Sequence, residues 1–319
     1  MKKTSSEIEK SGLHPRNRHR TRYDFDALAK ALPELKPFLI ANKFDVISID
    51  FSNPAAVIAL NKALLFHFYQ VSFWDLPTGF LCPPVPGRAD YLHHVADLMA
   101  LVNRSTIPTG PSVKVLDIGV GANCIYPIIG RYEYGWSFVG SEIDSKAVES
   151  AKKIVESNPL LSDEVSIRLQ KAPSKIFQDI IGAEDEFDLV ICNPPFHSDM
   201  KEAEDLNSRK WQNLGVKKER KEAFNFGGNN HELTYPGGEV AFVSNMIRQS
   251  VGFATKVYWF TSLVSRSENM PEIMKVLKRF KPTAFHVIEM EHGNKASRII
   301  AWTFLDNKQQ TIWKERRFW

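Results

Sequence analysis

The sequence predicts an α/β fold: a mostly parallel, doubly wound sheet of seven strands, preceded by a helical N-terminal extension. Two observations lead to this fold class. From about residue 89 onward, short apolar runs alternate with segments whose apolar residues recur at helical spacing, which is typical of a parallel sheet with helices on both faces. The first apolar run also ends in a glycine turn, at the edge where such sheets bind ligands.

The predicted strands are short apolar runs bounded by turn residues. They cover residues 113–118, 137–140, 165–169, 187–192, 256–263, 284–289 and 298–304. The predicted helices among them cover residues 145–156, 240–251 and 270–280. Because ligands bind at the carboxyl ends of the strands, the residues after the first, second and fourth strands are the first candidates for a functional site.

The chain divides into three parts of different composition. Residues 1–22 hold seven basic residues against two acidic ones, so we expect a flexible basic arm. Residues 23–88 show helical patterns broken by prolines and are expected to form a helical region that binds RNA and covers the cofactor. Residues 89–319 form the α/β domain, which a polar insertion interrupts at about 197–232.

The helical extension contains the most apolar stretch of the chain, residues 55–74. Polar residues interrupt it and its apolar residues recur at helical spacing, which predicts a buried helix and no membrane partner. Asn53 before Pro54 is the expected helix cap. The proline-rich segment 81–87 is expected to be an irregular connector.

The three cysteines indicate neither a disulfide framework nor a zinc site. Cys82, Cys124 and Cys192 lie far apart, and no two of them have the spacing of metal ligands. Together with a polar N-terminus that lacks the pattern of a signal peptide, they predict a cytoplasmic protein without a bound metal.

A glycine turn follows the first predicted strand. Gly119 and Gly121 let the backbone turn tightly and approach a ligand, and Asp117 precedes them within the strand. Cys124 stands where a dinucleotide-binding motif would have its third glycine, which disfavours NAD and FAD. Glu142, after the second strand, can accept both ribose hydroxyls of a nucleoside cofactor. This combination resembles the S-adenosylmethionine site of class I (Rossmann-like) methyltransferases.

The fourth predicted strand runs into Asn193, Pro194, Pro195 and Phe196. Consecutive prolines end strand pairing and fix a stiff turn. After a fourth strand, and together with the glycine turn, this motif resembles that of methyltransferases acting on planar amino groups, namely adenine N6, cytosine N4 or a glutamine amide.

The chemistry of a planar amine explains these residue types. Its lone pair is delocalised, so acceptors aimed at its two hydrogens favour attack and stabilise the charge that develops. The Asn193 side-chain oxygen and the Pro194 carbonyl can be those acceptors, and Phe196 can stack on a base. Positioning supplies the rest, so neither a metal nor a covalent nucleophile is needed. An adenine target has to be unpaired or flipped out of a helix.

Five further segments narrow the resemblance. They are residues 13–19, 80–91, 121–127, 193–197 and 259–266. Together they resemble the ribosomal RNA large subunit methyltransferase F family of bacteria, which makes N6-methyladenine in 23S rRNA. A vertebrate relative that methylates adenine in small nuclear and messenger RNA is similar more loosely. The resemblance covers the chain from about Leu13 to Phe304.

The resemblance implies a substrate, a cofactor and residue roles. The substrate would be adenine 1618 of 23S rRNA, free or in an assembly intermediate. Apart from the resemblance, we expect a monomer. Arg88 would contact S-adenosylmethionine, plausibly at its carboxylate, while Gly119 and Glu142 would be further cofactor ligands. Asn193 matches the first residue of the catalytic motif, and residues 173–176 would lie near the cofactor adenine.

Basic residues at two places are candidates for RNA contacts. Arg16, Arg18, Arg20 and Arg22 lie in the basic arm. The net charge is only +4, but basic chain ends on a nearly neutral body favour a polyanionic partner. In the insertion, Lys217 and Lys218 lie near Trp211 and could bind phosphates, although acidic residues there offset most of the charge.

Three other functions remain open from the residues alone. A protein glutamine-N5 methyltransferase uses a similar motif, but tyrosine is commoner at its last position. A DNA adenine methyltransferase would need a recognition domain for which the sequence offers no candidate. A non-catalytic RNA-binding factor of ribosome assembly could retain the fold, although the intact Asp117, Gly119, Glu142 and Asn193 argue against it.

Overall fold

The computed structural model describes residues 12–42, 45–198, 230–292 and 295–317. The helices are α1 (Phe25–Ala31), α2 (Pro54–Tyr69), α3 (Val85–Val102), α4 (Ile125–Tyr134), α5 (Ser145–Glu156), α6 (Pro159–Ser162), α8 (Asn230–Leu233), α9 (Gly238–Ser250), α10 (Met270–Arg279) and α11 (Asn307–Arg317). The strands are β1 (Leu39–Ala41), β2 (Ile47–Ile49), β3 (Lys114–Ile118), β4 (Ser137–Glu142), β5 (Val165–Leu169), β6 (Phe187–Cys192), β7 (Val257–Val264), β8 (Ala284–His292) and β9 (Lys295–Thr303).

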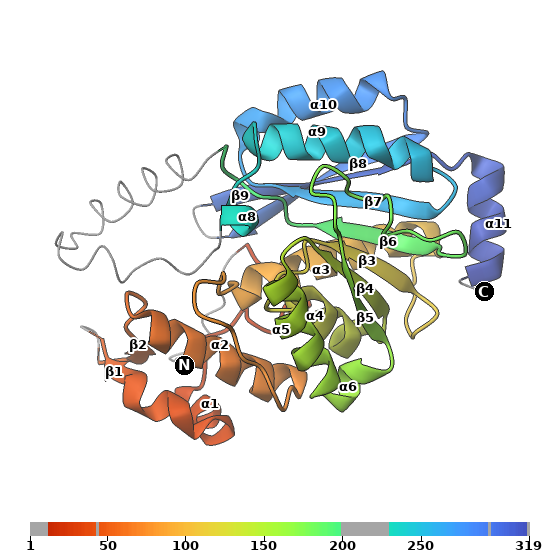
Figure 1. Ribbon diagram of the computed structural model, residues 1–319. Coiled ribbons are helices and arrows are strands. Elements are labelled where there is room, and N and C mark those ends of the chain that lie inside the picture. Colours follow the sequence, from red (N-terminus) through yellow and green to blue (C-terminus); the bar gives the residue numbers. More distant parts are fainter. Residues whose placement is uncertain (1–11, 43–44, 199–229, 293–294, 318–319) are drawn as a thin grey trace, which may run out of the picture.

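Within the described residues, seven strands form one sheet in the order β5-β4-β3-β6-β7-β9-β8 (Figure 1). Neighbours from β5 to β7 are parallel, whereas β9 is antiparallel to both β7 and β8. The chain starts the sheet at β3, moves outward to β5, and returns past β3 to β6. The predicted doubly wound, mostly parallel sheet is therefore confirmed, and its strand order reverses between β3 and β6, where a ligand crevice is expected.

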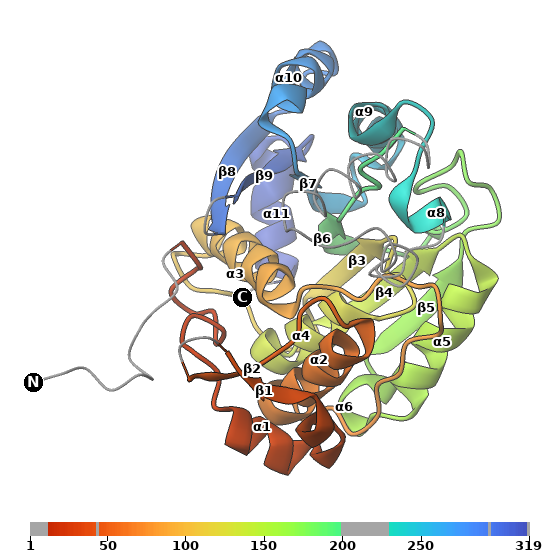
Figure 2. The same ribbon diagram turned by 90° about the vertical axis from the view of Figure 1, so that its left-hand side faces the viewer.

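Helices cover both faces of the sheet, and each face has its own apolar core (Figure 2). Along β6 the side chains alternate: Leu189 and Ile191 pack with α3, α4 and α5, while Val190 and Cys192 pack with α9 and α10. This explains why a continuous apolar run in the sequence forms a strand, since a central strand is buried on both sides.

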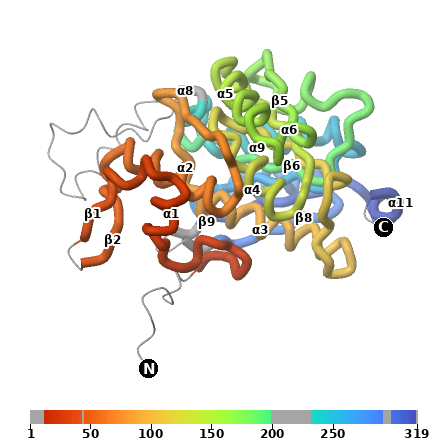
Figure 3. The backbone as a smooth tube through the Cα atoms, turned by 90° about the horizontal axis from the view of Figure 1, so that it is seen from below, coloured from red at the N-terminus to blue at the C-terminus, as the bar shows by residue number. Residues whose placement is uncertain are grey.

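The N-terminal elements lie together beside the sheet domain (Figure 3). The predicted cap of α2 is confirmed, because the Asn53 side chain accepts hydrogen bonds from the backbone N–H groups of Ala55 and Ala56. The expectation of an irregular segment at 81–87 is wrong at its end: α3 starts at Val85. Pro84 and Pro86 do not prevent this, since the first helical turn has no N–H partners to lose. The expected domain boundary at 88/89 thus falls inside α3.

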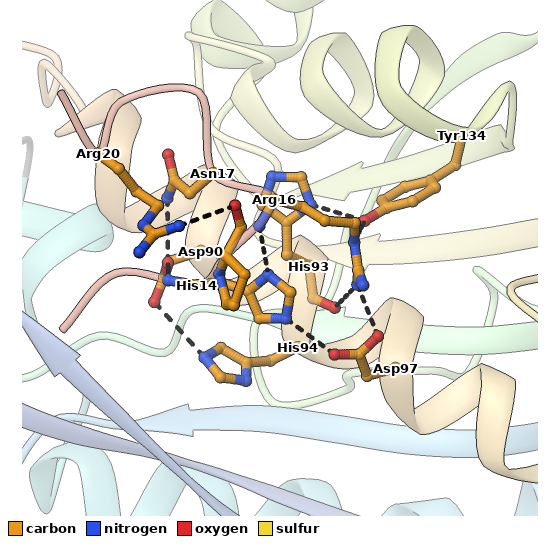
Figure 4. A network of polar contacts seen from close by, with 10 residues as sticks. His14, Arg16, Asn17, Arg20, Asp90, His93, His94, Asp97 and Tyr134 are labelled. Atoms are coloured by element: carbon orange, nitrogen blue, oxygen red, sulfur yellow. Dashed lines mark hydrogen bonds and ion pairs between the residues drawn. The ribbon is translucent and has the colours of Figure 1, made fainter. Parts of the chain in front are cut away.

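Residues 12–22 do not form the flexible arm expected from their charge. His14, Asn17 and His19 are buried: the first two lie against α3, and the His19 ring bonds the Tyr69 hydroxyl of α2. The backbone N–H of His14 and the side chain of Asn17 both donate to Asp90 on α3, at 2.7 and 3.0 Å (Figure 4). Specific polar partners on α3 therefore hold this segment, and a count of charges cannot reveal them. Residues 1–11 lie outside the described residues.

Candidate active site

A cavity of about 370 Å³ lies at the carboxyl ends of β3, β4 and β6, where the strand order reverses. Its walls come from four parts of the chain: the strand ends with their turns, the segment after β5, the N-terminal extension and the chain that follows the insertion. A volume of this size suits a small-molecule ligand. The cavity is lined by Gly119 and Gly121, by Glu142, and by Asn193, so it brings together some residues of each of the two predicted motifs.

The glycine turn and Glu142 form one hydrogen-bonded unit. Gly119 and Gly121 have φ angles of +73° and +66°, which favour glycine. The Glu142 carboxylate accepts hydrogen bonds from the backbone N–H groups of Gly121, Ile143 and Asp144. Burial raises the pKa of Glu142, and these three hydrogen bonds oppose the rise. The backbone thus fixes this carboxylate at the cavity wall.

Asp117 lies beneath the glycine turn and is fully buried. Its carboxylate oxygens have no hydrogen-bond partner among the described residues, and Asp117 does not line the cavity itself. Burial raises its pKa strongly, the charge of Glu142 adds to the rise, and Arg88 opposes it. A buried carboxyl without a partner is costly, so a cation or donor bound above the turn would stabilise it.

Arg88 and Asn193 contact each other across the cavity. The Arg88 guanidinium donates a hydrogen bond from Nη1 to the Asn193 side-chain oxygen at 2.9 Å, and a longer one to the Tyr126 hydroxyl at 3.4 Å. The Asn193 oxygen therefore faces the cation, and its amide orientation is fixed. The sequence proposed a role for each residue but not this contact.

The other residues of the proline motif do not all line the cavity. Pro195 lines the cavity together with Asn193, whereas Pro194 and Phe196 are not among its lining residues. Pro194 is buried and Phe196 is half-buried. The roles expected for the Pro194 carbonyl and the Phe196 ring thus stay predictions.

A chain of buried hydroxyl groups supports the end of β6. Pairing between β6 and β7 stops at Val190. Beyond it, the backbone N–H of Cys192 donates a hydrogen bond to the Tyr91 hydroxyl at 3.3 Å. The Tyr91 hydroxyl forms a hydrogen bond with the Thr261 hydroxyl at 2.7 Å, and Thr261 donates one to the Val190 carbonyl at 2.8 Å. Tyr91 is fully buried. These hydroxyl groups thus provide hydrogen-bond partners for the backbone of β6 directly before Asn193.

Several lining residues were not predicted from the sequence. Leu81 and Pro83 come from the segment before α3, Glu232 lies at the end of the predicted insertion, and Tyr235 and others follow it. Residues 173–176, which the family resemblance placed near the cofactor adenine, also line the cavity. The segment after the insertion is held in place because His197 pairs with Thr234, and Tyr235 donates its N–H to the His197 carbonyl. No local motif marks these positions.

The predicted RNA-binding arginines have partners within the protein. Arg16 donates to Asp97 at 2.7 Å, to the His93 carbonyl at 2.9 Å and to the Tyr134 hydroxyl (Figure 4). Arg18 pairs with Glu133 at 2.6 Å.

The remaining basic candidates differ in their surroundings. Arg20 donates to the Pro15 carbonyl, and Arg22 is exposed. Lys217 and Lys218 lie outside the described residues. Arg16 and Arg18 therefore help to hold residues 12–22 in place, in addition to the RNA contacts predicted for them.

Two further observations limit the chemistry of the described part of the chain. It contains no group of histidine, cysteine and acidic side chains arranged to hold a metal ion. None of its helices is both long and apolar enough to span a membrane.

Comparisons with known proteins identify the family of the chain. A family model described as RNA methyltransferase matches residues 7–306. Ribosomal RNA large subunit methyltransferase F of Serratia proteamaculans is 52% identical over 318 residues, which are 99% of this chain and 95% of the relative. The protein of the same name from Photobacterium profundum is 49% identical over 334 aligned positions, which cover 100% of this chain and 99% of the relative.

Solved structures are similar over nearly the same length. The human Mettl16 catalytic domain in complex with a MAT2A 3′UTR hairpin superposes with a TM-score of 0.78 at 30% identity, covering 93% of this chain and 96% of that one. The N-terminal domain of human METTL16 in complex with SAH superposes with a TM-score of 0.71 at 28% identity, and the match covers 92% of this chain and 99% of that one. The fold is that of the class I methyltransferases, and S-adenosylmethionine is the methyl donor. The chain belongs to the RNA methyltransferase family.

Proposed function

We propose that this enzyme methylates the N6 amine of one adenine in 23S rRNA, by resemblance adenine 1618. The observation that carries the proposal is the cavity that the glycine turn and Asn193 share, because a methyl donor bound at the turn would lie beside an amine bound at Asn193. The ribosomal RNA named for the 52% identical relative supports the substrate class. We further propose that the enzyme acts in the cytoplasm as a monomer.

The residues around the cavity fit S-adenosylmethionine. The buried carboxyl of Asp117, which has no partner in the described chain, suits a cationic ligand. Glu142 is fixed by three backbone N–H groups and would accept the ribose hydroxyls, and Arg88 would receive the cofactor carboxylate. A Cβ at Gly119 would meet no atom within 4 Å, so the turn leaves room for the ligand there. When bound, the cofactor supplies a methyl group on a positively charged sulfur.

Asn193 would act on the substrate amine. Its side-chain oxygen would accept a hydrogen bond from the N6 amino group, and the Pro194 carbonyl would take the second hydrogen. Such preorganised acceptors stabilise the charge that develops on the nitrogen, and the proton leaves to solvent after the transfer. The hydrogen bond from Arg88 fixes the Asn193 amide, so that its oxygen, and not its nitrogen, faces the Arg88 guanidinium. Neither a metal nor a nucleophilic side chain is part of this mechanism.

RNA would approach from the side of the N-terminal extension. Arg16 and Arg18 are partly exposed even though each pairs with a carboxylate, so a phosphate can approach both of them. Arg22 is exposed. Because phosphate contacts position RNA and base contacts specify it, these arginines would orient the substrate and the pocket would select the adenine.

Methyl transfer to a 23S rRNA transcript, with analysis of the product nucleosides, tests the proposal. The wild type should form N6-methyladenosine. Asn193→Ala should lower the rate by about a hundredfold, the loss seen when one preorganised donor or acceptor is removed. Its affinity for S-adenosylhomocysteine, measured by calorimetry, should stay within a few-fold. Asn307→Ala, at the exposed start of α11, is the matched control.

Two outcomes would refute the proposal. Methyl transfer to protein glutamine, with none to RNA, would identify the enzyme as a protein methyltransferase. RNA binding without methyl transfer to any substrate would indicate an assembly factor that has kept only the fold.

A further inference from the structure

Residues 12–22 contact one face of α3, from its first turn onward. Their hydrogen bonds reach four residues of that helix: Pro86, Asp90, His93 and Asp97. Since successive residues of an α-helix lie about 100° apart around its axis, these four positions form a single stripe along α3. By the same spacing, Arg88 lies on the opposite side of the helix.

The opposite face of α3 leads to the active site. Arg88 lines the cavity, and its guanidinium donates a hydrogen bond to the Asn193 side-chain oxygen at 2.9 Å. A longer hydrogen bond, at 3.4 Å, joins it to the Tyr126 hydroxyl. A shift or rotation at the start of α3 would therefore move the guanidinium away from Asn193.

Asn17 holds the first turn of α3 from the side of the N-terminal segment. It is buried, and its Nδ2 atom donates to the Pro86 carbonyl at 2.9 Å and to the Asp90 carboxylate at 3.0 Å (Figure 4). Pro84, at the cap position of α3, makes no side-chain hydrogen bond to the helix start. Since Arg88 lies between Pro86 and Asp90 in the chain, one amide holds the helix on both sides of it.

We propose that Asn17 is a positioning residue for methyl transfer, which holds the start of α3 where the Arg88 guanidinium meets Asn193. Residues 12–22 do not line the cavity, so Asn17 acts through the helix. The proposal rests on the placement of S-adenosylmethionine beside Arg88 proposed above. It gives a docked N-terminal segment a task in the reaction that is separate from RNA binding.

The variant Asn17→Ser separates the contact with α3 from the local turn. A serine hydroxyl can still accept the backbone N–H of His19, which the Asn17 side-chain oxygen accepts at 3.0 Å, but it is too short to reach Pro86. With RNA and S-adenosylmethionine saturating, kcat should fall about tenfold, because a small misplacement of reacting groups has effects of this order. Affinity for S-adenosylhomocysteine, measured by calorimetry, should fall about threefold or more.

A double-mutant cycle with Arg88→Ala tests whether Asn17 acts through Arg88. A residue that acts through another has no further effect once that other residue is gone, whereas independent defects add. In the Arg88→Ala background, Asn17→Ser should therefore change kcat and S-adenosylhomocysteine affinity by less than about twofold. The affinity cycle needs no methyl acceptor, so it does not depend on the proposed RNA substrate.

Matched variants distinguish this contact from a general loss of stability. Tyr69→Phe removes the hydroxyl that the His19 ring bonds at 2.8 Å. It loosens the same segment on α2 instead of α3, and should leave kcat and affinity within about twofold. Asp90→Asn keeps the shape of the acceptor but removes its charge, so it should give the pattern of Asn17→Ser at smaller size. Thermal unfolding identifies any variant that loses its fold, and Asp90→Asn supplies the test if Asn17→Ser does so.

Three results would overturn the inference. Losses that add in the cycle would mean that Asn17 stabilises the fold without acting through Arg88. A higher KM for RNA, with kcat and cofactor affinity unchanged, would mean that the segment serves RNA binding alone. Equal losses for Tyr69→Phe and Asn17→Ser would assign the effect to docking of the whole segment. A wild type that binds S-adenosylhomocysteine but methylates no RNA would instead refute the proposed function, and the affinity cycle would still decide the role of Asn17.

Discussion

His93 makes the stability of this protein depend on pH in a way that can be calculated. It lies in α3 beneath residues 12–22 and is 1% exposed. Its ring stacks on His14, with ring centroids 5.4 Å apart, and its Nδ1 atom bonds the Tyr134 hydroxyl at 2.6 Å. Burial lowers the pKa of His93 from 6.5 to about 3, and the charges of His14 and Arg16 act in the same direction.

The sign and size follow from proton linkage. Above about pH 6.5 the imidazole is neutral in both the folded and unfolded chain. Between about pH 6.5 and 3 the unfolded chain binds a proton that folded His93 does not, so stability falls as the pH falls, by up to about 1.4 kcal/mol per unit. At pH 5 the contribution lost is about 2 kcal/mol. The lowered pKa of His14 acts in the same direction.

Urea unfolding of the wild type and of His93→Asn measures this term. Asparagine places a polar atom near the position of Nδ1 but does not titrate. Between about pH 7.5 and 5, the wild type should lose roughly 2 kcal/mol more stability than the variant. His67→Asn, at an exposed position of α2, controls for the removal of an imidazole. Equal slopes for the wild type and His93→Asn would show that His93 is protonated in the folded protein, against the burial argument.

Three further perturbations test other parts of the account. Tyr91→Phe removes the hydroxyl that supports Cys192, so the rate of methyl transfer should fall about tenfold while S-adenosylhomocysteine affinity is kept; loss of both together would show a general folding defect. Asp188→Asn should destabilise the fold by about 2–3 kcal/mol in urea unfolding, because this buried carboxylate accepts from Trp313 and Arg317 of α11; a change below about 0.5 kcal/mol would contradict this. Neutralising Arg22 should reduce the salt dependence of RNA binding by about one unit of slope; an unchanged slope would exclude a phosphate contact there.

The strands of the seven-stranded sheet were predictable because each contains its own short apolar run. The bounds of β5 and β6 agree with the sequence prediction, as do those of α5. Asp144 caps α5, since its side chain accepts hydrogen bonds from the backbone N–H groups of Lys146 and Ala147. Such features depend on neighbouring residues, so a local pattern reveals them.

The missed elements depend on distant contacts or contain residues that disguise the pattern. Helix α4 has Pro127 and Gly130 within it, and Gly130 lets the helix lie directly against Phe138 of β4, where a Cβ would come within 2.3 Å of the ring. Helix α11 is largely polar and is held through Asp188, more than a hundred residues away in the chain. The β1–β2 hairpin has strands too short for a visible alternation.

Some residues of the site could likewise be predicted from local motifs, whereas contacts between distant segments could not. The glycine turn, Glu142 and Asn193 could be identified because each belongs to a short motif with its own chemistry. The contact of Arg88 with Asn193, the support from Tyr91 and the position of Glu232 each join segments far apart in the sequence. Charge alone predicted RNA contacts for Arg16 and Arg18, and the structure adds that both first serve as ion-pair partners of Asp97 and Glu133.

The central claim is that Asn193 in this pocket directs a methyl group to one adenine N6 of 23S rRNA. Mapping N6-methyladenine in 23S rRNA tests it directly, in cells that lack the gene and in the same cells carrying the wild type or Asn193→Ala. We predict that the mark disappears without the gene, that the wild type restores it, and that Asn193→Ala, produced at the same level, does not. A mark that persists without the gene, or that Asn193→Ala restores in full, would contradict the account.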